Sequence, residues 1–408
     1  MQRKSTHNLK LKTMKKFSQL LIISLFFSPM FLTGQNLRSV WHQVEINNLT
    51  IRALKQQSEA EQMGNRVGLA PENPEVEFAY LWGTPSEVGH RIDVSVTQSF
   101  DFPTSYVYRS RIANLKNEQA EIAVRKECRE MMIEIGKLYY EIVYQNVRIS
   151  DANKCLGYVS NVSKAYKQKL DAGSINIFDY NKVKLTELNM RQELEHAIVR
   201  RDNLLRELQQ YNGGQAIPVT DTLFPPIDLP SDFDSWYQQV EKNNPMLAWI
   251  DKEQEINAQQ QKLDKSGWAP QFSAGYMREQ VPSETFQGIK IGISVPLWHN
   301  VNSLKQTKLQ SSAITLLAAD EQFQFRNRLQ SQYAIVDSHL KQVEEYESLL
   351  ADINSFELLQ LALEKGEISL VDYLMEYSIY HESHEKLFEL ERDAAQNFVE
   401  IELLTNGK

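Results

Sequence analysis

Two histidines, His381 and His384, are the residues whose types and spacing most suggest metal chemistry. They stand three positions apart in "HESH", so on a helix they share one face, a spacing that two metal ligands can use. The sequence offers no third ligand close by, and the pattern is not the H-E-x-x-H pair of metalloproteases. We therefore expect two solvated histidines on a helix surface and predict neither a metal site nor a cofactor.

A second candidate site is a stretch that the chain contains twice, as "LDAGSINIFDY" at 170–180 and "LEKGEISLVDY" at 363–373. Five of the eleven positions are identical. The glycine permits a tight chain reversal, and the aspartate that follows suits a helix N-terminus, where a carboxylate caps free N–H groups. We expect each copy to be a turn between two helices. The candidate site residues are Gly173, Asp179, Tyr180, Gly366, Asp372 and Tyr373.

The remaining residue types give no support for an enzyme. Cys128 and Cys155 fall in one expected helix, about 40 Å apart at 1.5 Å per residue, which is too far for a disulfide. We interpret both as small apolar core residues. The sequence has no glycine-rich phosphate loop, no nucleophile elbow and no convincing pair of carboxylates for acid–base catalysis. We predict that the protein is not an enzyme.

The N-terminus has the features of an export signal. Basic residues precede the apolar run "LLIISLFFSPMF" at 20–31, and we predict a signal peptide over residues 1–35. Its removal takes away six basic and no acidic residues, which moves the formal net charge from −9 to −15. Such a charge argues against nucleic acid as a partner. After the signal, no apolar run is long enough for a transmembrane helix.

The elements that must position the repeated turns are long helices. No proline occurs between Pro103 and Pro218, and none follows Pro296. Because proline breaks helix interiors, we predict long helices over 103–213 and 298–405, each interrupted at its glycine turn. Apolar residues recur in both blocks at intervals of three and four, as in the seam of a coiled coil.

Before each long helical block, the apolar residues alternate with a period of two. This pattern predicts two β-hairpins, over 75–101 and 271–297, with one apolar face and one small or polar face. Periodicity alone fits a soluble hairpin and a membrane hairpin equally well. If the strands face lipid, four strands cannot close, so the chain must oligomerise. Two copies would give eight strands with a filled interior, and three copies would give twelve with a lumen.

The chain therefore divides into two similar halves. We predict one repeat over 36–213 and another over 232–405, joined by a proline-rich crossover at 214–231. The first half begins with an expected helix over 36–66. The second begins with helices near 232–243 and 246–267. Each half then continues as hairpin, long helix, glycine turn and long helix, which indicates an internal duplication.

This arrangement resembles the TolC family of outer-membrane efflux channels. The resemblance covers residues 36 to 405 and rests on the order of the elements, the repeated L-[DE]-x-G-x-I-x-[IL]-x-D-Y turns, and "SVPLWHN" before a proline-free helix. The approach "ENPEVEF" to the first strand is similar to the branch of the family that serves heavy-metal efflux pumps. No single motif is very specific, whereas the duplicated arrangement is.

The resemblance implies an α+β membrane protein. Four strands per protomer would form a twelve-stranded β-barrel in a homotrimer, continuous with a long antiparallel α-helical coiled-coil barrel. It also implies a passive conduit in the outer membrane of a Gram-negative bacterium that extends into the periplasm. The implied partners are a periplasmic adaptor (a membrane fusion protein), an inner-membrane transporter of the resistance-nodulation-division type, and outer-membrane lipid.

In the family, acidic residues at the two turns line or latch the closed tunnel entrance. The resemblance implies this role for Asp179 and Asp372. Three copies would place a ring of negative charge there. The chain departs from the family at Leu363 and Ile368, where a tyrosine and an arginine form the latch, and at Met375, where a second aspartate stands. Helix capping alone explains the two aspartates equally well.

Two other functions remain open at this point. A periplasmic coiled-coil adaptor also has long helical hairpins, but it should show a glycine-rich lipoyl-like domain, one hairpin and an N-terminal anchor. A soluble coiled-coil scaffold would not need four alternating strands.

Overall fold

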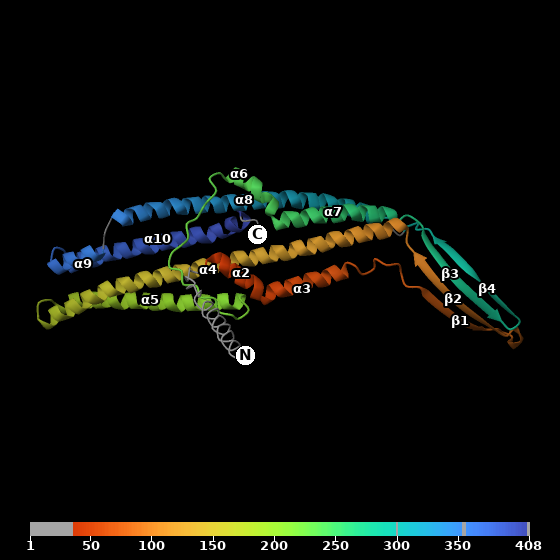
Figure 1. The fold of residues 1–408 in the computed structure, drawn as a ribbon, viewed down its shortest axis with the longest axis horizontal. Helices are drawn as coiled ribbons and strands as arrows, with labels where there is room; N and C mark the ends of the chain where they lie inside the picture. The colour runs from red at the N-terminus through yellow and green to blue at the C-terminus, as the bar shows by residue number, and fades with distance from the viewer. Residues whose placement is uncertain (1–35, 299–300, 353–355, 406–408) are drawn as a thin grey trace, which may run out of the picture.

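The computed structural model describes residues 36–298, 301–352 and 356–405. The molecule is elongated, with long helices lying side by side and a sheet at one end (Figure 1). The predicted signal peptide at 1–35 lies outside the described residues and stays a prediction. No helix among the described residues combines the length and the apolar content needed to cross a membrane.

The first helical hairpin consists of α4 (Pro103–Asp171) and α5 (Ile177–Tyr211). Pro103 stands at the first turn of α4, where its missing N–H costs nothing, and the 69 residues of the helix contain no other proline. The chain reverses between the two helices over a few residues. At the far end of α5, Gly213 has a φ of +63°, a backbone conformation that ends the helix.

The second helical hairpin consists of α8 (Ser303–Asp352), α9 (Phe356–Lys365) and α10 (Leu370–Thr405). Shorter helices precede it, namely α6 (Phe233–Val240), the 3₁₀ turn η2 (Glu241–Asn243) and α7 (Pro245–Ser266). The two helical hairpins lie side by side, and their turns are at the same end of the molecule, opposite the sheet (Figure 1).

The expected single helix over 36–66 is wrong, because the structure has two helices there, α2 (Leu37–Asn47) and α3 (Leu49–Gly64). Asn48 separates them with an extended backbone. Its side-chain oxygen accepts a hydrogen bond from the backbone N–H of Ile51 at 2.8 Å, which caps α3. Its side-chain nitrogen donates to the carbonyl of Tyr211 at 2.7 Å, which ties this corner to the end of α5.

The sheet contains β1 (Glu75–Trp82), β2 (His90–Phe100), β3 (Gln271–Val281) and β4 (Glu284–Ser294). A short 3₁₀ turn, η1 (Ser86–Val88), lies between the first two strands. The strand order is β1-β2-β3-β4, and every pair is antiparallel. The central pair, β2 and β3, joins the two halves of the chain. The helices run away from the sheet and do not cover it (Figure 1).

Several apolar clusters are distributed along the helices instead of one central core. The largest lies where α2, α4, α5, α10 and the crossover at 214–231 meet, and it includes Val40, Ile142, Leu208, Ile217 and Val399. A second joins α6 to α8 and to the end of α10. A third lies at the helix turns. Burial is therefore spread along the rod, which suits an architecture of long packed helices.

Candidate functional site

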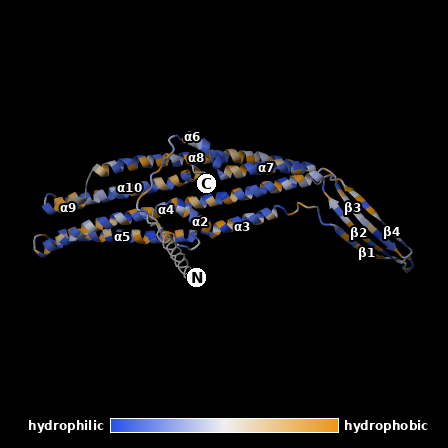
Figure 2. Cartoon of the chain, in the orientation of Figure 1, coloured by the Kyte–Doolittle hydropathy of each residue, from blue (hydrophilic) through white to orange (hydrophobic). Residues whose placement is uncertain are grey.

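Most of the large apolar side chains of the strands lie on one face of the sheet, and the strand register shows why. The alternating apolar residues of the four strands pair with one another, so that they come to the same side. The pairs include Val76 with Val96, Phe78 with Val94, Phe100 with Phe272, Phe272 with Ile293, and Tyr276 with Ile289. Arg278 and Gln280 of β3 interrupt this face, opposite Val94 and Ile92. Figure 2 shows hydrophobic and hydrophilic residues mixed along each strand, as this alternation requires.

These apolar side chains are exposed in the single chain. Ile289 is 83% exposed, Ile291 is 78% exposed and Trp82 is 79% exposed. Soluble proteins rarely expose a contiguous apolar surface of this extent, because water contact with it is unfavourable. The sheet therefore requires a further apolar environment on this face.

The opposite face of the sheet is mainly polar or small, although Leu81, Met277 and Phe286 also lie on it. Arg91 lies 2.8 Å from a carboxylate oxygen of Asp93 and 3.1 Å from one of Glu279, so these charges form a network across β2 and β3. Ser95 donates to Glu77 at 3.1 Å on the same face. A sheet with one apolar and one charged face separates a nonpolar from an aqueous environment.

The edges of the sheet are β1 and β4, and each has a neighbour on one side. The unpaired N–H and C=O groups of an edge strand seek a partner strand. In lipid such groups cannot be left unpaired, and four strands are too few to close on themselves. Two arrangements are therefore compatible with this sheet. Its edges pair with strands of other chains in a larger closed sheet, or the edges of β1 and β4 stay exposed to water.

At the opposite end of the molecule, the two repeated stretches form the same turn. Gly173 and Gly366 have φ values of +69° and +76°. In each turn the glycine N–H donates to the carbonyl three residues back, and the next N–H donates to the carbonyl five residues back. This pair of bonds is the Schellman motif, which requires a left-handed residue and so favours glycine.

Asp179 and Asp372 lie in the first turns of α5 and α10, but the residues that cap these helices are Asn176 and Ser369. The Asn176 side chain accepts from the backbone N–H of Asp179 at 2.9 Å, and its amide donates to the carboxylate at 2.9 Å. The Ser369 hydroxyl accepts from the backbone N–H of Asp372 at 3.2 Å, and the carboxylate accepts from the Ser369 N–H at 3.3 Å. Both are reciprocal capping arrangements.

The tyrosines that follow differ between the two turns. Tyr373 is 1% exposed, and its hydroxyl has no hydrogen-bond partner among the described residues. Burial raises the pKa of Tyr373 to about 12. Tyr180 is only partly buried, and Lys167 lies 5.9 Å from the centre of its ring.

An apolar cluster joins the two turns directly. Val162 and Val183 from the first hairpin pack with Leu363 and Tyr373 from the second, and Ile368 packs against this cluster. Leu363 and Ile368 are the positions at which the resemblance implies a polar latch. In this chain they make hydrophobic contacts between the turns instead, while Met375 is 63% exposed.

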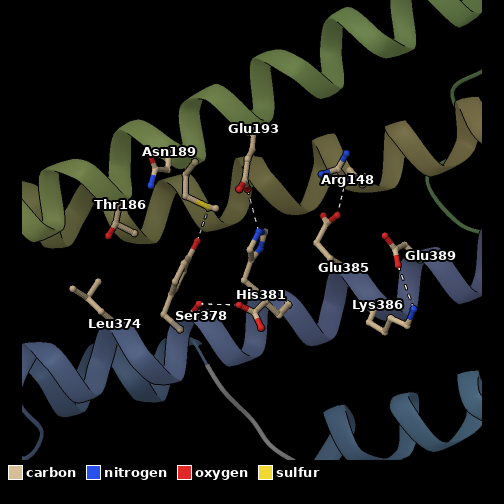
Figure 3. A pocket seen from close by; sticks show the side chains of 13 residues that line it. Arg148, Thr186, Asn189, Glu193, Leu374, Ser378, His381, Glu385, Lys386 and Glu389 are labelled. Carbon is tan, nitrogen blue, oxygen red and sulfur yellow. Dashed lines mark hydrogen bonds and ion pairs between the residues drawn. The ribbon is translucent and has the colours of Figure 1, made fainter.

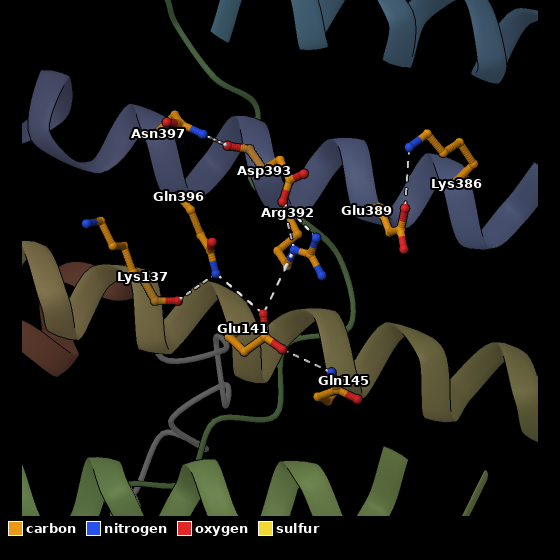
Figure 4. Close-up of polar contacts among 9 residues, drawn as sticks. All are labelled: Lys137, Glu141, Gln145, Lys386, Glu389, Arg392, Asp393, Gln396 and Asn397. Carbon is orange, nitrogen blue, oxygen red and sulfur yellow. Dashed lines mark hydrogen bonds and ion pairs between the residues drawn. The ribbon is translucent and has the colours of Figure 1, made fainter. Parts of the chain in front are cut away.

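Farther from the turns, α4 and α10 meet along a polar seam that sequence reasoning missed. Glu141 of α4 accepts from Gln145 at 3.2 Å and from Gln396 at 3.5 Å, and it lies 3.9 Å from Arg392 (Figure 4). Arg392 also lies 4.5 Å from the ring centre of Tyr144. The seam joins the two halves of the chain through groups that no local sequence pattern brings together.

The seam continues into a cavity of about 530 Å³ between α4, α5 and α10. Arg148 of α4 donates to Glu385 of α10 at 2.7 Å, and His381 of α10 lies 3.1 Å from Glu193 of α5 (Figure 3). Burial raises the pKa of Glu385, and the positive charge of Arg148 partly offsets this increase. The expectation of a solvated histidine is wrong for His381, whose side chain is 15% exposed, whereas His384 is half-buried at 29%.

Comparison with known proteins identifies the fold. No protein-family model and no curated protein matches the chain. Among solved structures, CusC, in work on folding and transmembrane channel formation, has a TM-score of 0.75 at 14% identity over 94% of this chain and 95% of that one. The CmeC outer membrane channel of Campylobacter jejuni has a TM-score of 0.69 at 12% identity over 92% of this chain and 86% of that one.

The open state of the MtrE outer membrane channel of Neisseria gonorrhoeae has a TM-score of 0.68 at 13% identity. That match covers 90% of this chain and 88% of that chain. The chain thus has the fold of outer-membrane channels over nearly its whole described length, with both its sheet and its helical hairpins included.

Proposed function

We propose that this protein is an outer-membrane channel of the TolC type, a passive conduit in a tripartite efflux or secretion system. Three copies would combine their sheets into a closed twelve-stranded β-barrel, and their helices into a continuous periplasmic tunnel. The channel would receive its substrates from a periplasmic adaptor and an inner-membrane transporter, in keeping with the resemblance to the family. The fold shared with CusC, CmeC and MtrE supports the proposal.

The observation that carries the proposal is the uncovered four-stranded sheet. Most of its large apolar residues lie on one face and are exposed, its charged network lies on the other face, and neither edge has a partner strand among the described residues. Closure with other copies satisfies the edges, and lipid covers the apolar face. The polar face then lines the lumen. One arrangement thus accounts for all three features, of which the exposed apolar face and the unpaired edges would be unfavourable in a soluble monomer.

The length of the helices supports the conduit. A straight helix of 69 residues, such as α4, extends over about 100 Å at 1.5 Å per residue. The two hairpins of each copy lie parallel to this axis (Figure 1). Six hairpins from three copies would enclose a long passage below the barrel. This architecture gives no reason to expect catalysis, and we assign the protein no enzymatic activity and no catalytic cofactor.

The two turns would lie at the periplasmic entrance of this tunnel. Gly173, Asp179 and Tyr180 belong to one turn, and Gly366, Asp372 and Tyr373 to the other. Because the turns pack on each other through the cluster around Tyr373, we propose that hydrophobic contacts hold the two turns of each copy together at the entrance and that the aspartates act on passing ions. Export through the predicted signal peptide would deliver the chain to the outer membrane, with its helices in the periplasm.

Conductance in planar lipid bilayers tests this function. Purified protein should insert and give discrete, stable current steps, since a closed barrel with a polar lumen conducts ions. A variant with Ile289→Asp and Ile291→Asp on the lipid-facing side of β4 should fail to insert, because charge on that face is costly in lipid. Absence of channels from the unaltered protein, or steps that persist unchanged in the double variant, would contradict the proposal.

A further inference from the structure

Three side chains with different metal-binding atoms meet between α4 and α10. Asp151 and Cys155 come from α4, and His381 comes from α10. One oxygen, the sulfur and one ring nitrogen all lie within 4.8 Å of one another. In the described parts of the chain, this is the one group of its kind. Only His381 of "HESH" belongs to this group, and its other two members come from a helix more than 200 residues away in sequence.

The spacing of the first two ligands fits a tetrahedral ion. Cys155 Sγ lies 3.6 Å from Asp151 Oδ2. Bonds of about 2.3 Å to sulfur and about 2.0 Å to oxygen, at a tetrahedral angle, place these atoms about 3.5 Å apart. The two residues stand four positions apart, one helical turn, so the backbone of α4 holds this spacing. Cys155 is 1% exposed, which protects the sulfur from solvent.

His381 has the nitrogen arrangement of a metal ligand. Its Nε2 lies 3.1 Å from a carboxylate oxygen of Glu193 on α5 (Figure 3). Its Nδ1 is buried and has no hydrogen-bond partner among the described residues. A buried polar atom without a partner is rare and calls for an explanation. Metal-bound histidines typically donate their second ring N–H to a carboxylate, as His381 can do toward Glu193.

The carboxylate of Asp151 is oriented in a similar way. Its Oδ2 faces Cys155, while its Oδ1 lies 3.9 Å from Nδ1 of His384. His384 thus stands beside the cluster, where it can hold the carboxylate in position. His381 also lines the cavity between α4, α5 and α10, which gives an ion and water a path to the cluster.

We propose that Asp151, Cys155 and His381 bind a divalent transition-metal ion of the class of Zn²⁺, with water as the fourth ligand. One thiolate, one imidazole and one carboxylate are a donor set that zinc accepts, whereas Mg²⁺ and Ca²⁺ require oxygen ligands. The bound ion links α4 of the first helical hairpin to α10 of the second. This inference does not depend on the channel function, because metal binding is measured on the protein itself.

Binding requires the loss of one proton. The thiolate of Cys155, and not the thiol, is the form that binds a metal ion. The metal–sulfur bond forms as the S–H bond breaks, and the proton passes to solvent. Affinity therefore rises with pH, and each bound ion releases about one proton into a weakly buffered solution.

Titration of the purified full-length protein with Co²⁺, a spectroscopic substitute for Zn²⁺, tests the site. We expect one ion per chain, visible d–d bands of tetrahedral cobalt and a near-ultraviolet charge-transfer band from thiolate to metal. Cys155→Ser should abolish the charge-transfer band and weaken binding at least 100-fold. The matched control is Cys128→Ser, since Cys128 is the other cysteine of α4 and lies outside the cluster; it should leave both unchanged. Glu193→Gln should weaken binding about tenfold by releasing His381.

Three results would overturn the proposal: no stoichiometric binding of Co²⁺, a charge-transfer band that persists in Cys155→Ser, or a band lost only in Cys128→Ser. If Cys155→Ser does not fold, as judged by circular dichroism, the isosteric Asp151→Asn decides the question. Weaker binding in that variant, with unchanged helix content, supports the site. Unchanged binding contradicts it.

Discussion

The two helical hairpins end in turns with the same backbone and opposite charge. Residues 164–184, around the first turn, contain five lysines and two aspartates, a formal charge of +3. The equivalent window 357–377, offset by 193 positions, contains five carboxylates and one lysine, a formal charge of −4. Both turns nevertheless use a left-handed glycine and a reciprocal cap. Backbone chemistry therefore constrains the turn, whereas the surrounding charge is free to diverge.

The difference changes how the aspartates are understood. Asp179 lies 3.3 Å from Lys182 in a lysine-rich turn, so its charge is largely compensated. Asp372 lies in an acidic turn, where its contacts are with Ser369. In the proposed trimer the entrance would present alternating positive and negative turns instead of a uniform ring of negative charge. The following predictions test this comparison, from the largest expected effect to the smallest.

The contrast in burial between the equivalent tyrosines predicts the largest effect. Tyr373→Ala should destabilise the protein by about 3 to 5 kcal/mol, because it opens a cavity in the cluster between the turns. Tyr180→Ala, at the partly exposed position, should cost less than half as much. Tyr373→Phe should be neutral or slightly stabilising, since the buried hydroxyl has no partner. Denaturant unfolding followed by circular dichroism measures all three. Equal losses at the two tyrosines would mean that the turns do not differ in packing.

The second hairpin also contains a carboxyl group that should make its stability depend on pH. Burial, with repulsion from Glu347, raises the pKa of Glu391 to about 7. An unfolded chain titrates this group near 4.5, so its unfavourable contribution begins above that pH and is complete above pH 7. Glu391→Gln should therefore stabilise the protein at pH 8 by up to about 3 kcal/mol, and by nothing at pH 4. Unfolding curves at the two pH values check this, and a gain of equal size at both would refute it.

The shared backbone predicts equal effects at the two glycines. Gly173→Ala and Gly366→Ala should each cost about 1 kcal/mol, because φ is positive while a Cβ meets no neighbouring atom at either position. Gly157→Ala is the matched control: this glycine lies inside α4 with open space around it, so the same change should stabilise by about 1 kcal/mol. Thermal unfolding of the three variants measures these effects. Different shifts in unfolding temperature for Gly173→Ala and Gly366→Ala would show that the two turns are not equivalent.

The smallest effect concerns charge alone. Asp372→Asn should weaken the block of single-channel current by divalent cations, whereas Asp179→Asn should change it less, because Lys182 already compensates Asp179. The two carboxylates are exposed to screening, so the difference should shrink as ionic strength rises. Bilayer recordings at two salt concentrations measure this. A larger effect from Asp179 would reverse our assignment of the charged entrance.

Several features of the fold were predictable because they depend on local chemistry. The absence of proline from 104 to 217 predicted a long helical block. Apolar residues at every second position in segments such as 289–297 predicted the apolar sheet face. The glycine turns followed from Gly173 and Gly366. The helix caps could also be predicted from the sequence, since Asn176 and Ser369 each stand three residues before an aspartate, the spacing of a capping box.

Other features depend on contacts between distant segments. Asn48 divides the first helix because it bonds to Tyr211, which no local pattern indicates. The Asp151–Cys155–His381 cluster requires the pairing of α4 with α10. Leu363 and Ile368 lack the polar chemistry that a latch needs, and only the packing of the two turns shows what they contact. Tertiary partners of this kind cannot be read from one sequence.

The mass and cellular fraction of the detergent-extracted protein test the central claim most directly, namely that the four-stranded sheet closes with other copies in a membrane. We predict that the protein fractionates with the outer membrane and that its mass, after correction for bound detergent, is about three times that of the protomer, since closure requires strands from several chains. A monomer in the soluble fraction would show that the strands never enter lipid, and it would contradict the channel.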